Sequence, residues 1–191
     1  MKKHHTQKWK LVLLSLSVLV ISCNQSTKNS TNEKETIMNT ESKLRDQLVG
    51  AWRMKAYVEI DEETGEKNYP FGTNPDGFII YTTDGYMSAQ IQKNGRKPFK
   101  DNDMFRGTSE EYIEEASGYL AYSGRFFVDE KEMKITHEMA VSLFPNWLGN
   151  QQKRIVRIEN NVLNLETDGP LMFNGKMKVA KITWERATAN F

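Results

Sequence analysis

Two side chains stand out for the chemistry that they could perform, His137 and Arg125. His137 shares strand parity with Met133, Ile135 and Met139, which places it on the apolar face of an expected strand. There it could hydrogen-bond the polar end of a ligand, act as a general base, or be a core histidine that bonds a neighbour. Arg125 would bind a carboxylate if its side chain pointed inward, and would be ordinary surface if it pointed outward.

Other patterns that carry chemistry are missing from the sequence. It contains no phosphate-binding glycine-rich loop and no nucleophile elbow. Asp101-Asn102-Asp103 superficially suggests a calcium loop, but the required glycine and the distal glutamate are absent. No cofactor or metal is therefore expected, and the lack of a catalytic constellation favours binding over catalysis.

The single cysteine, Cys23, follows a segment that is typical of a secretory signal peptide. Four lysines precede the apolar run Leu11–Ile21, which is too short to span a bilayer. The sequence Val20-Ile21-Ser22-Cys23 resembles a lipobox, with valine where leucine is usual. A lone cysteine cannot form an internal disulfide. We therefore expect cleavage after residue 22 and lipidation of Cys23; the alternative is an ordinary signal peptide that ends near a cysteine.

The expected mature chain is a lipid-anchored protein of the cell envelope. Asn24 after the cysteine resembles the outer-membrane sorting pattern, which applies if the host is Gram-negative. Residues 23–43 are polar and rich in Ser, Thr and Asn, so we expect a flexible tether. Removing residues 1–22 leaves 22 basic against 25 acidic residues, a balance that does not suggest nucleic-acid binding.

Residues 44–191 are the size of one domain and show a mostly β pattern. Short apolar-alternating runs are separated by turn signals, as in sandwiches and closed barrels. Asp84-Gly85 and Asn160-Asn161 are typical of hairpin turns. We expect strands over residues 48–58, 77–82, 86–91, 125–128, 133–139, 154–159, 162–166 and 178–186.

One helix is expected within the β pattern, over residues 108–120. It begins at a capping box formed by Thr108 and Glu111. Tyr112, Ala116 and Tyr119 would form its apolar face, which needs a partner. With the preceding loop, residues 93–107, this helix is expected to cross one end of a barrel, either as a lid over a ligand or as a fixed plug.

Five segments together resemble the lipocalin-like domain family. They are Gly50-Ala51-Trp52-Arg53, Tyr69-Pro70-Phe71-Gly72 through Ile80-Tyr81-Thr82, Tyr86-Met87-Ser88-Ala89-Gln90, Gly118-Tyr119-Leu120-Ala121-Tyr122 and Leu143-Phe144-Pro145-Asn146-Trp147. The resemblance covers nearly all of residues 46–187 and implies an all-β fold, an antiparallel barrel of about eight strands with one inserted α-helix. It also implies a cup for a small hydrophobic ligand, although fold alone does not set function.

The resemblance assigns structural roles to Gly50, Trp52 and Arg186. In barrels of this type a tryptophan from the first strand closes the floor, and an arginine from the last strand packs over its ring. Trp184, two residues before Arg186, could compete for that position. The side chains that could line a ligand site are Tyr69, Phe71, Tyr81, Met87, Tyr119, Tyr122, Arg125, His137, Phe144 and Trp147.

Three functions follow as hypotheses. The first is a membrane-anchored protein that binds or carries a small hydrophobic molecule in its barrel. The second is a cyclase or isomerase in which His137, Arg125 and a tyrosine transfer protons inside the same cup. The third is a structural or stress-related envelope lipoprotein with a filled barrel.

Overall fold

The structure, a computed structural model, describes residues 43–190. The expected signal peptide, the lipidated Cys23 and most of the expected tether lie outside the described residues. The elements, in chain order, are α1 (Leu44–Leu48), β1 (Gly50–Asp61), β2 (Lys67–Asn68), β3 (Asp76–Tyr81), β4 (Tyr86–Gln92), α2 (Ser109–Ser117), β5 (Tyr119–Asp129), β6 (Lys134–Ser142), the 3-10 helix η1 (Pro145–Trp147), β7 (Gln151–Glu159), β8 (Val162–Thr167), β9 (Leu171–Phe173) and β10 (Lys176–Arg186).

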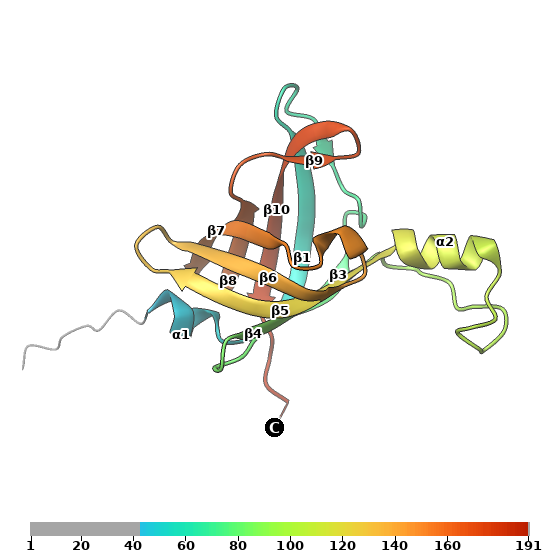
Figure 1. The fold of residues 1–191 in the computed structure, drawn as a ribbon, viewed down its shortest axis with the longest axis horizontal. Helices are drawn as coiled ribbons and strands as arrows, with labels where there is room; N and C mark the ends of the chain where they lie inside the picture. The colour runs from blue at the N-terminus through green and yellow to red at the C-terminus, as the bar shows by residue number, and fades with distance from the viewer. Residues whose placement is uncertain (1–42, 191) are drawn as a thin grey trace, which may run out of the picture. The chain divides into compact units, whose positions relative to one another are not determined.

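The described strands form one antiparallel sheet that closes on itself (Figure 1). Its order is β1-β3-β4-β5-β6-β7-β8-β10, and β10 pairs again with β1, so eight strands make a closed barrel. The short strands β2 and β9 extend β1 and β10 beyond the barrel. The all-β barrel expected from the sequence is confirmed.

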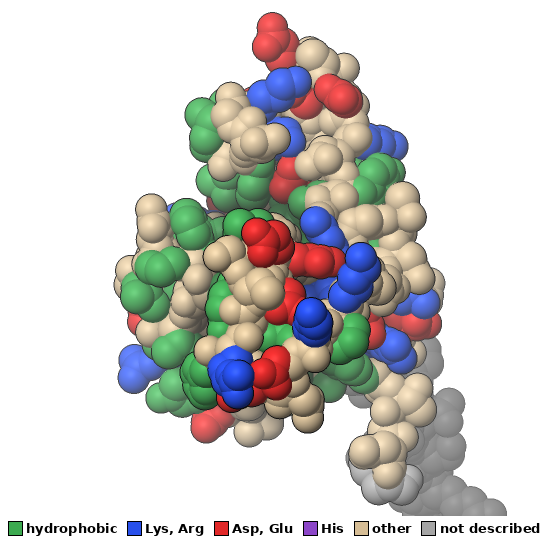
Figure 2. Space-filling model, turned by 90° about the vertical axis from the view of Figure 1, so that its right-hand side faces the viewer, with side chains coloured by type: hydrophobic (Ala, Val, Ile, Leu, Met, Phe, Trp, Pro, Cys, Tyr) green, Lys and Arg blue, Asp and Glu red, His purple; other side chains and the backbone are tan. Residues whose placement is uncertain are grey.

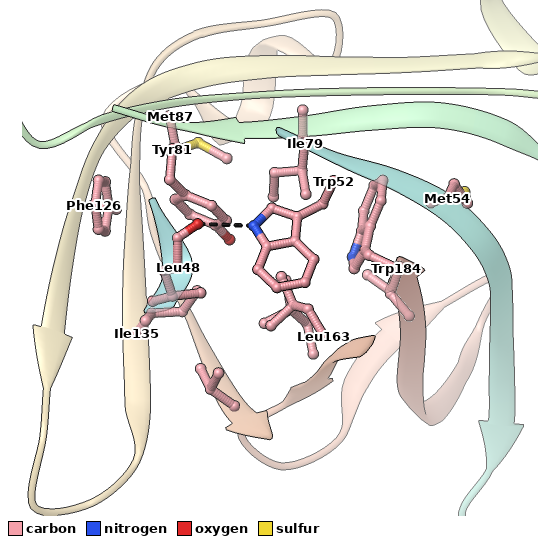
Figure 3. Packing of buried hydrophobic residues seen from close by; sticks show 14 of the residues in the cluster. Leu48, Trp52, Met54, Ile79, Tyr81, Met87, Phe126, Ile135, Leu163 and Trp184 are labelled. Atoms are coloured by element: carbon pink, nitrogen blue, oxygen red, sulfur yellow. Dashed lines mark hydrogen bonds between the residues drawn. The ribbon is translucent and has the colours of Figure 1, made fainter. Parts of the chain in front are cut away.

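Alternation of side chains along each strand separates the barrel interior from its surface. In β4, for example, Met87, Ala89 and Ile91 are buried, whereas the residues between them are more exposed. The buried apolar side chains form one continuous cluster (Figure 3). Burial of this surface is the main force that holds a small barrel together.

Strand β5 begins six residues before the position that the sequence analysis gave. Gly118 ends α2, and Tyr119 and Leu120 pair with β4 instead of continuing the helix. The expected place of Tyr119 on the helix face was therefore wrong. Gly124 lies within β5 at a bulge, where a Cβ would stand 1.8 Å from the Glu138 carbonyl oxygen. Only glycine fits at this position, and Gly124 lies inside the strand instead of marking its start.

One end of the barrel, which we call the closed end, is sealed by Trp52, Arg186 and α1. The Arg186 guanidinium carbon lies 3.7 Å from the centre of the Trp52 ring, and the Trp52 Nε1–H donates to the Leu48 carbonyl oxygen at 2.8 Å (Figure 3). Gly50 has φ +120°, and a Cβ there would lie 2.9 Å from Arg186 Nη1. The roles expected for Gly50, Trp52 and Arg186 fit these contacts, and Trp184 packs in the core beside them.

The opposite end, which we call the open end, is where β4 leaves the barrel and β5 returns. We call the segment between these strands, residues 93–118, the arm. It carries α2 and stands away from the barrel strands (Figure 1). The capping box of Thr108 and Glu111 is present, but α2 has no buried residue. On the face seen in Figure 2, hydrophobic side chains are scattered among charged ones. The helix was expected to cross one end of the barrel, as a lid or as a fixed plug, and in this structure it does neither.

The arm is held by local contacts, which explains why it needs no cover from the barrel. The rings of Phe99 and Tyr112 meet edge to face with centres 5.5 Å apart. The Tyr112 hydroxyl accepts from the Gly107 N–H at 2.9 Å and donates to the Met104 carbonyl at 3.2 Å. The apolar face of α2 is thus partly covered by residues of the arm itself.

Replacing Trp52 with alanine should be chiefly a folding lesion. The ring is fully buried, and deleting a buried tryptophan costs about 3–5 kcal/mol of the roughly 5–15 kcal/mol that stabilises a small domain. Urea denaturation followed by circular dichroism measures the loss. The control is Phe105→Ala, because Phe105 is largely exposed on the arm. Equal stability of W52A and the wild type would show that the tryptophan does not seal the barrel.

Candidate ligand site

Five buried polar or aromatic side chains converge inside the barrel from five different strands. We call this set the inner polar cluster: Tyr57 of β1, Tyr81 of β3, Tyr122 of β5, His137 of β6 and Arg154 of β7. Each is at most 6% exposed, which is unusual for arginine and histidine. Buried polar groups normally have hydrogen-bond partners, so the partners of this cluster indicate what the interior can bind.

His137 is fully buried, and only one of its two ring nitrogens has a partner. Nε2 lies 2.9 Å from the Tyr81 hydroxyl, whereas Nδ1 is buried without any hydrogen bond to the described residues. Burial, and to a lesser degree the nearby charge of Arg154, lowers the pKa of His137 to about 3. The ring is therefore neutral near pH 7, with one nitrogen as donor and the other as acceptor.

Aromatic rings surround the histidine and continue toward the open end. Tyr122 lies between His137 and Trp147, with ring-centre distances of 6.1 Å and 5.6 Å. The Tyr57 ring meets Phe71 edge to face at 5.2 Å. Phe71 and Trp147 are half-buried and pack against the core. A series of aromatic side chains thus extends from His137 to the open end.

The three phenols of the cluster stay protonated. Burial is the largest cause of the raised pKa of Tyr57, Tyr81 and Tyr122, and the Arg154 charge acts in the opposite direction on each of them. These hydroxyls can therefore donate a hydrogen bond at any physiological pH.

Arg154 contacts only neutral acceptors among the described residues. Its Nη1 and Nη2 both donate to the Gln152 Oε1 atom at 3.2 Å, and Nη1 also donates to the Lys153 carbonyl at 2.8 Å. Nearer the open end, the buried Lys178 and Glu59 pair with each other at 3.0 Å. Among the described residues, the buried Glu59 and Asp61 thus have lysine partners, Lys178 and Lys176, whereas Arg154 has no carboxylate partner.

The structure separates the predicted ligand residues into three groups. Four lie buried inside the barrel: Tyr81, Met87, Tyr122 and His137. Phe71 and Trp147 lie half-buried at the open end, where Tyr69 and Phe144 are exposed. The remaining two lie on the outer surface.

Arg125 and Tyr119 are the two predicted residues on the outer surface. Arg125 is exposed on β5, so its side chain points outward; of the two alternatives, ordinary surface is right and carboxylate binding in the interior is wrong. Tyr119 packs outside the barrel, under the Arg96 guanidinium, and donates to Gln90. The bulge at Gly124 shifts the register between β5 and β6. Side chains alternate along β5 after the bulge, so Arg125 points to the face opposite the buried Phe126.

Two members of the cluster, Tyr57 and Arg154, were missed by the sequence analysis. In a regular strand, Trp52 and Tyr57 would face opposite sides, because side chains alternate along the chain. A bulge between Met54 and Ala56 shifts this alternation in β1, so both side chains point inward. Arg154 shares parity with the buried Val156, and that pattern was a usable signal. A charged residue at an inward position of an expected strand, such as Arg154, predicts a polar group inside the barrel.

A separate cleft of about 630 Å³ lies on the outer surface. It is lined by side chains and backbone of β1, β3 and the end of β10, including Arg53, Lys55, Asp76 and Glu185. It includes no member of the inner polar cluster. Within residues 43–190, no set of His, Cys, Asp and Glu side chains is grouped so as to hold a metal ion.

Comparison with known proteins places this barrel in a family. The family profile described as the lipocalin-like domain matches residues 49–187, which is most of the chain. The chain belongs to the lipocalin-like domain family. The match includes every strand of the barrel and the whole inner polar cluster.

One curated relative and one solved structure are similar to this chain. The 4'-hydroxy-3'-methoxypropiophenone carrier protein ppsC of Aspergillus oryzae is 35% identical over 106 residues, which is 52% of this chain and 96% of that protein. The crystal structure of a lipocalin-like protein from Bacteroides uniformis is similar with a TM-score of 0.38 and 13% identity. That alignment covers 73% of this chain and 98% of the other.

The depressed pKa of His137 predicts an acid-sensitive fold. The unfolded chain takes up a proton near pH 6.5, whereas folded His137 does so only near pH 3. Between these values the free energy of unfolding should therefore decrease by up to about 1.4 kcal/mol per pH unit as the pH falls. Comparing urea denaturation of the wild type and His137→Asn from pH 7 to pH 4 isolates this effect. Parallel pH profiles of the two proteins would contradict it.

Proposed function

We propose that this protein binds or carries a small, largely apolar molecule inside its barrel, with the polar end of that molecule against His137. The observation that carries the proposal is the unpartnered Nδ1 of His137, a fully buried polar atom in an interior walled by aromatic rings. Leaving such an atom unsatisfied costs about 1–3 kcal/mol, and a ligand hydroxyl or carbonyl would remove that cost.

The walls of the interior suit a flat, ring-containing ligand. Tyr57, Phe71, Tyr122 and Trp147 offer ring faces and edges, and aromatic pairs gain about 0.5–1.5 kcal/mol beyond the area they bury. Because Phe71 and Trp147 are only half-buried, they are the side chains that would move aside for entry. Binding would thus require small rearrangements at the open end and none at the closed end.

The fungal relative supports the same class of ligand. Its name describes a carrier of 4'-hydroxy-3'-methoxypropiophenone, an aromatic ketone with a phenol hydroxyl. Such a molecule combines an apolar ring with a hydrogen-bonding group at each end. Both features match the aromatic walls and the free nitrogen of the inner polar cluster.

A second candidate, catalysis, is favoured by the Tyr81–His137 hydrogen bond. A tyrosine hydroxyl 2.9 Å from a buried imidazole could transfer a proton to an apolar substrate, as a cyclase or isomerase requires. The carrier hypothesis differs in one respect that can be measured: a carried molecule leaves the protein chemically unchanged.

We also propose that the protein works at a membrane of the cell envelope, held there by lipid on Cys23. The support is the signal-like segment before the only cysteine. Of the helices within residues 43–190, none has the length and apolar character needed to cross a bilayer. An acylated cysteine carrying two or three chains would hold the protein firmly, because each buried CH₂ contributes about 0.8 kcal/mol.

Ligand binding should stabilise the protein and depend on His137. The probe is 4'-hydroxy-3'-methoxypropiophenone, and we expect it to raise the melting temperature of the purified wild type. His137→Leu should weaken binding by about tenfold, since one buried hydrogen bond is lost. Phe127→Leu, on the outer face of β5, is the matched control and should bind normally. Mass spectrometry of the recovered probe separates carriage from turnover.

Two results would contradict the carrier proposal. If neither this probe nor a panel of small apolar molecules shifts the melting temperature, the barrel is a filled structural unit and the carrier proposal is wrong. If the probe is recovered chemically altered only with the wild type, the catalytic candidate replaces it.

Cys23→Ser should release a folded protein from membranes. The lost thiol removes the only atom that can carry the lipid, whereas residues 43–190 keep their packing. Fractionation of cells into membrane and soluble portions measures the effect, and Ser26→Ala in the expected tether is the control. A C23S protein that remains wholly in the membrane fraction would show that Cys23 is not the anchor.

A further inference from the structure

We infer that the ligand of this barrel is an acid, and that its carboxylate binds the free edge of the Arg154 guanidinium. The inference rests on the proposed function, because it names the chemical class of the molecule held in the same interior. It is carried by the contacts of Arg154 and by the charges that surround it.

Arg154 is a buried cation at an inward position. It is 5% exposed and lies on β7 between the barrel neighbours Ile135 of β6 and Thr167 of β8. Taking a guanidinium out of water costs several kcal/mol unless a counter-charge and hydrogen bonds replace its hydration. A counter-ion is therefore expected for this side chain.

The protein itself does not supply that counter-ion. Among residues 43–190, no carboxylate oxygen lies within 4 Å of the Arg154 nitrogens. The two other charged side chains buried nearest the open end, Glu59 and Lys178, neutralise each other, and the Asn68 amide further occupies the Glu59 oxygen. Asp61 is likewise paired, with Lys176. The interior is left with one positive charge that no described residue balances.

The hydrogen bonds of Arg154 show which side of the guanidinium is free. Gln152 Oε1 accepts from both Nη atoms, so it occupies the edge between them, and Lys153 accepts the other Nη1 proton. The edge formed by Nε and Nη2 has no protein partner within the described residues. Two parallel N–H groups on one edge are the geometry that binds both oxygens of a carboxylate.

The neighbours of Arg154 favour an anion at that edge. Gln152, which holds the guanidinium, pairs with His137 across β7 and β6, so Arg154 and His137 enter the interior from neighbouring strands. With Tyr81 donating to Nε2, the Nδ1 atom of His137 carries the ring proton and becomes a donor. An acid could then accept hydrogen bonds from both Arg154 and His137, while its apolar part lies among the rings.

Matched acids and amides test the inference. The probes are 3-phenylpropanoate with 3-phenylpropanamide, and dodecanoate with dodecanamide, measured by calorimetry; the two pairs separate aromatic from aliphatic acids. The wild type should prefer at least one acid over its amide by about tenfold or more. In Arg154→Gln that preference should vanish, while amide binding stays within about twofold. The control is Arg125→Gln, which removes an exposed arginine on β5 and should keep the preference.

Two further measurements distinguish the possible failures. Arg154→Lys retains the charge without the planar edge, and it should show an intermediate preference; it also serves if circular dichroism shows that Arg154→Gln does not fold. Equal binding of acid and amide by a wild type that binds the neutral propiophenone would overturn the acid inference and leave the proposed function standing. Absence of binding by every probe, the neutral one included, would overturn both.

Discussion

The contact of Arg186 with Trp52 joins the two ends of the domain, and the barrel depends on it. Trp52 lies on the first long strand and Arg186 on the last, so their stacking holds the seam where the sheet closes on itself. The guanidinium also donates to the carbonyls of Gln47 and Val49, which fixes the chain between α1 and β1. A cation can be half-buried here because the ring face and two carbonyls replace its water.

This seal rests on an apolar core, beside which the barrel interior also holds polar side chains. Toward the closed end the core is apolar, with Leu48, Ile79 and Leu163 packed around Trp52 (Figure 3). Other inward positions carry the inner polar cluster, which reaches the closed end at Tyr81, the partner of Gly50 across β1 and β3. A rigid, well-packed floor is what allows polar side chains above it to be held in fixed positions, since binding sites need a scaffold that does not yield.

Fold and ligand preference can vary separately in such an architecture. The floor contacts and the register of eight strands require apolar or glycine residues at set positions, as at Gly50 and Gly124. The inner polar cluster uses inward positions where many residue types would fit the sheet equally well. The arm with α2 is more independent still, because its stability comes from its own capping box and from Phe99 on Tyr112.

Local pattern in the sequence determined the class of fold and much of its detail. The turns at Asp84-Gly85 and Asn160-Asn161, the capping box at Thr108 and the inward parity of His137 are all properties of short stretches, and each is present in the structure. These features follow from backbone geometry and from the two-residue period of a strand, which a single sequence records directly. The role of Trp52 and Arg186 in closing the barrel floor was instead predicted from the resemblance to the lipocalin-like family.

Only the tertiary structure decided which polar groups meet inside the barrel. Tyr57 points inward because of a bulge, Arg125 points outward, and Arg154 is buried on β7, the strand paired with the one that carries His137. A bulge of one residue reverses the faces of everything after it, and pairing between strands sets distances that no spacing along the chain encodes. The capping box and the amphipathic pattern predicted the helix itself, whereas the local packing of Phe99 on Tyr112, seen only in the structure, lets it stand outside the barrel.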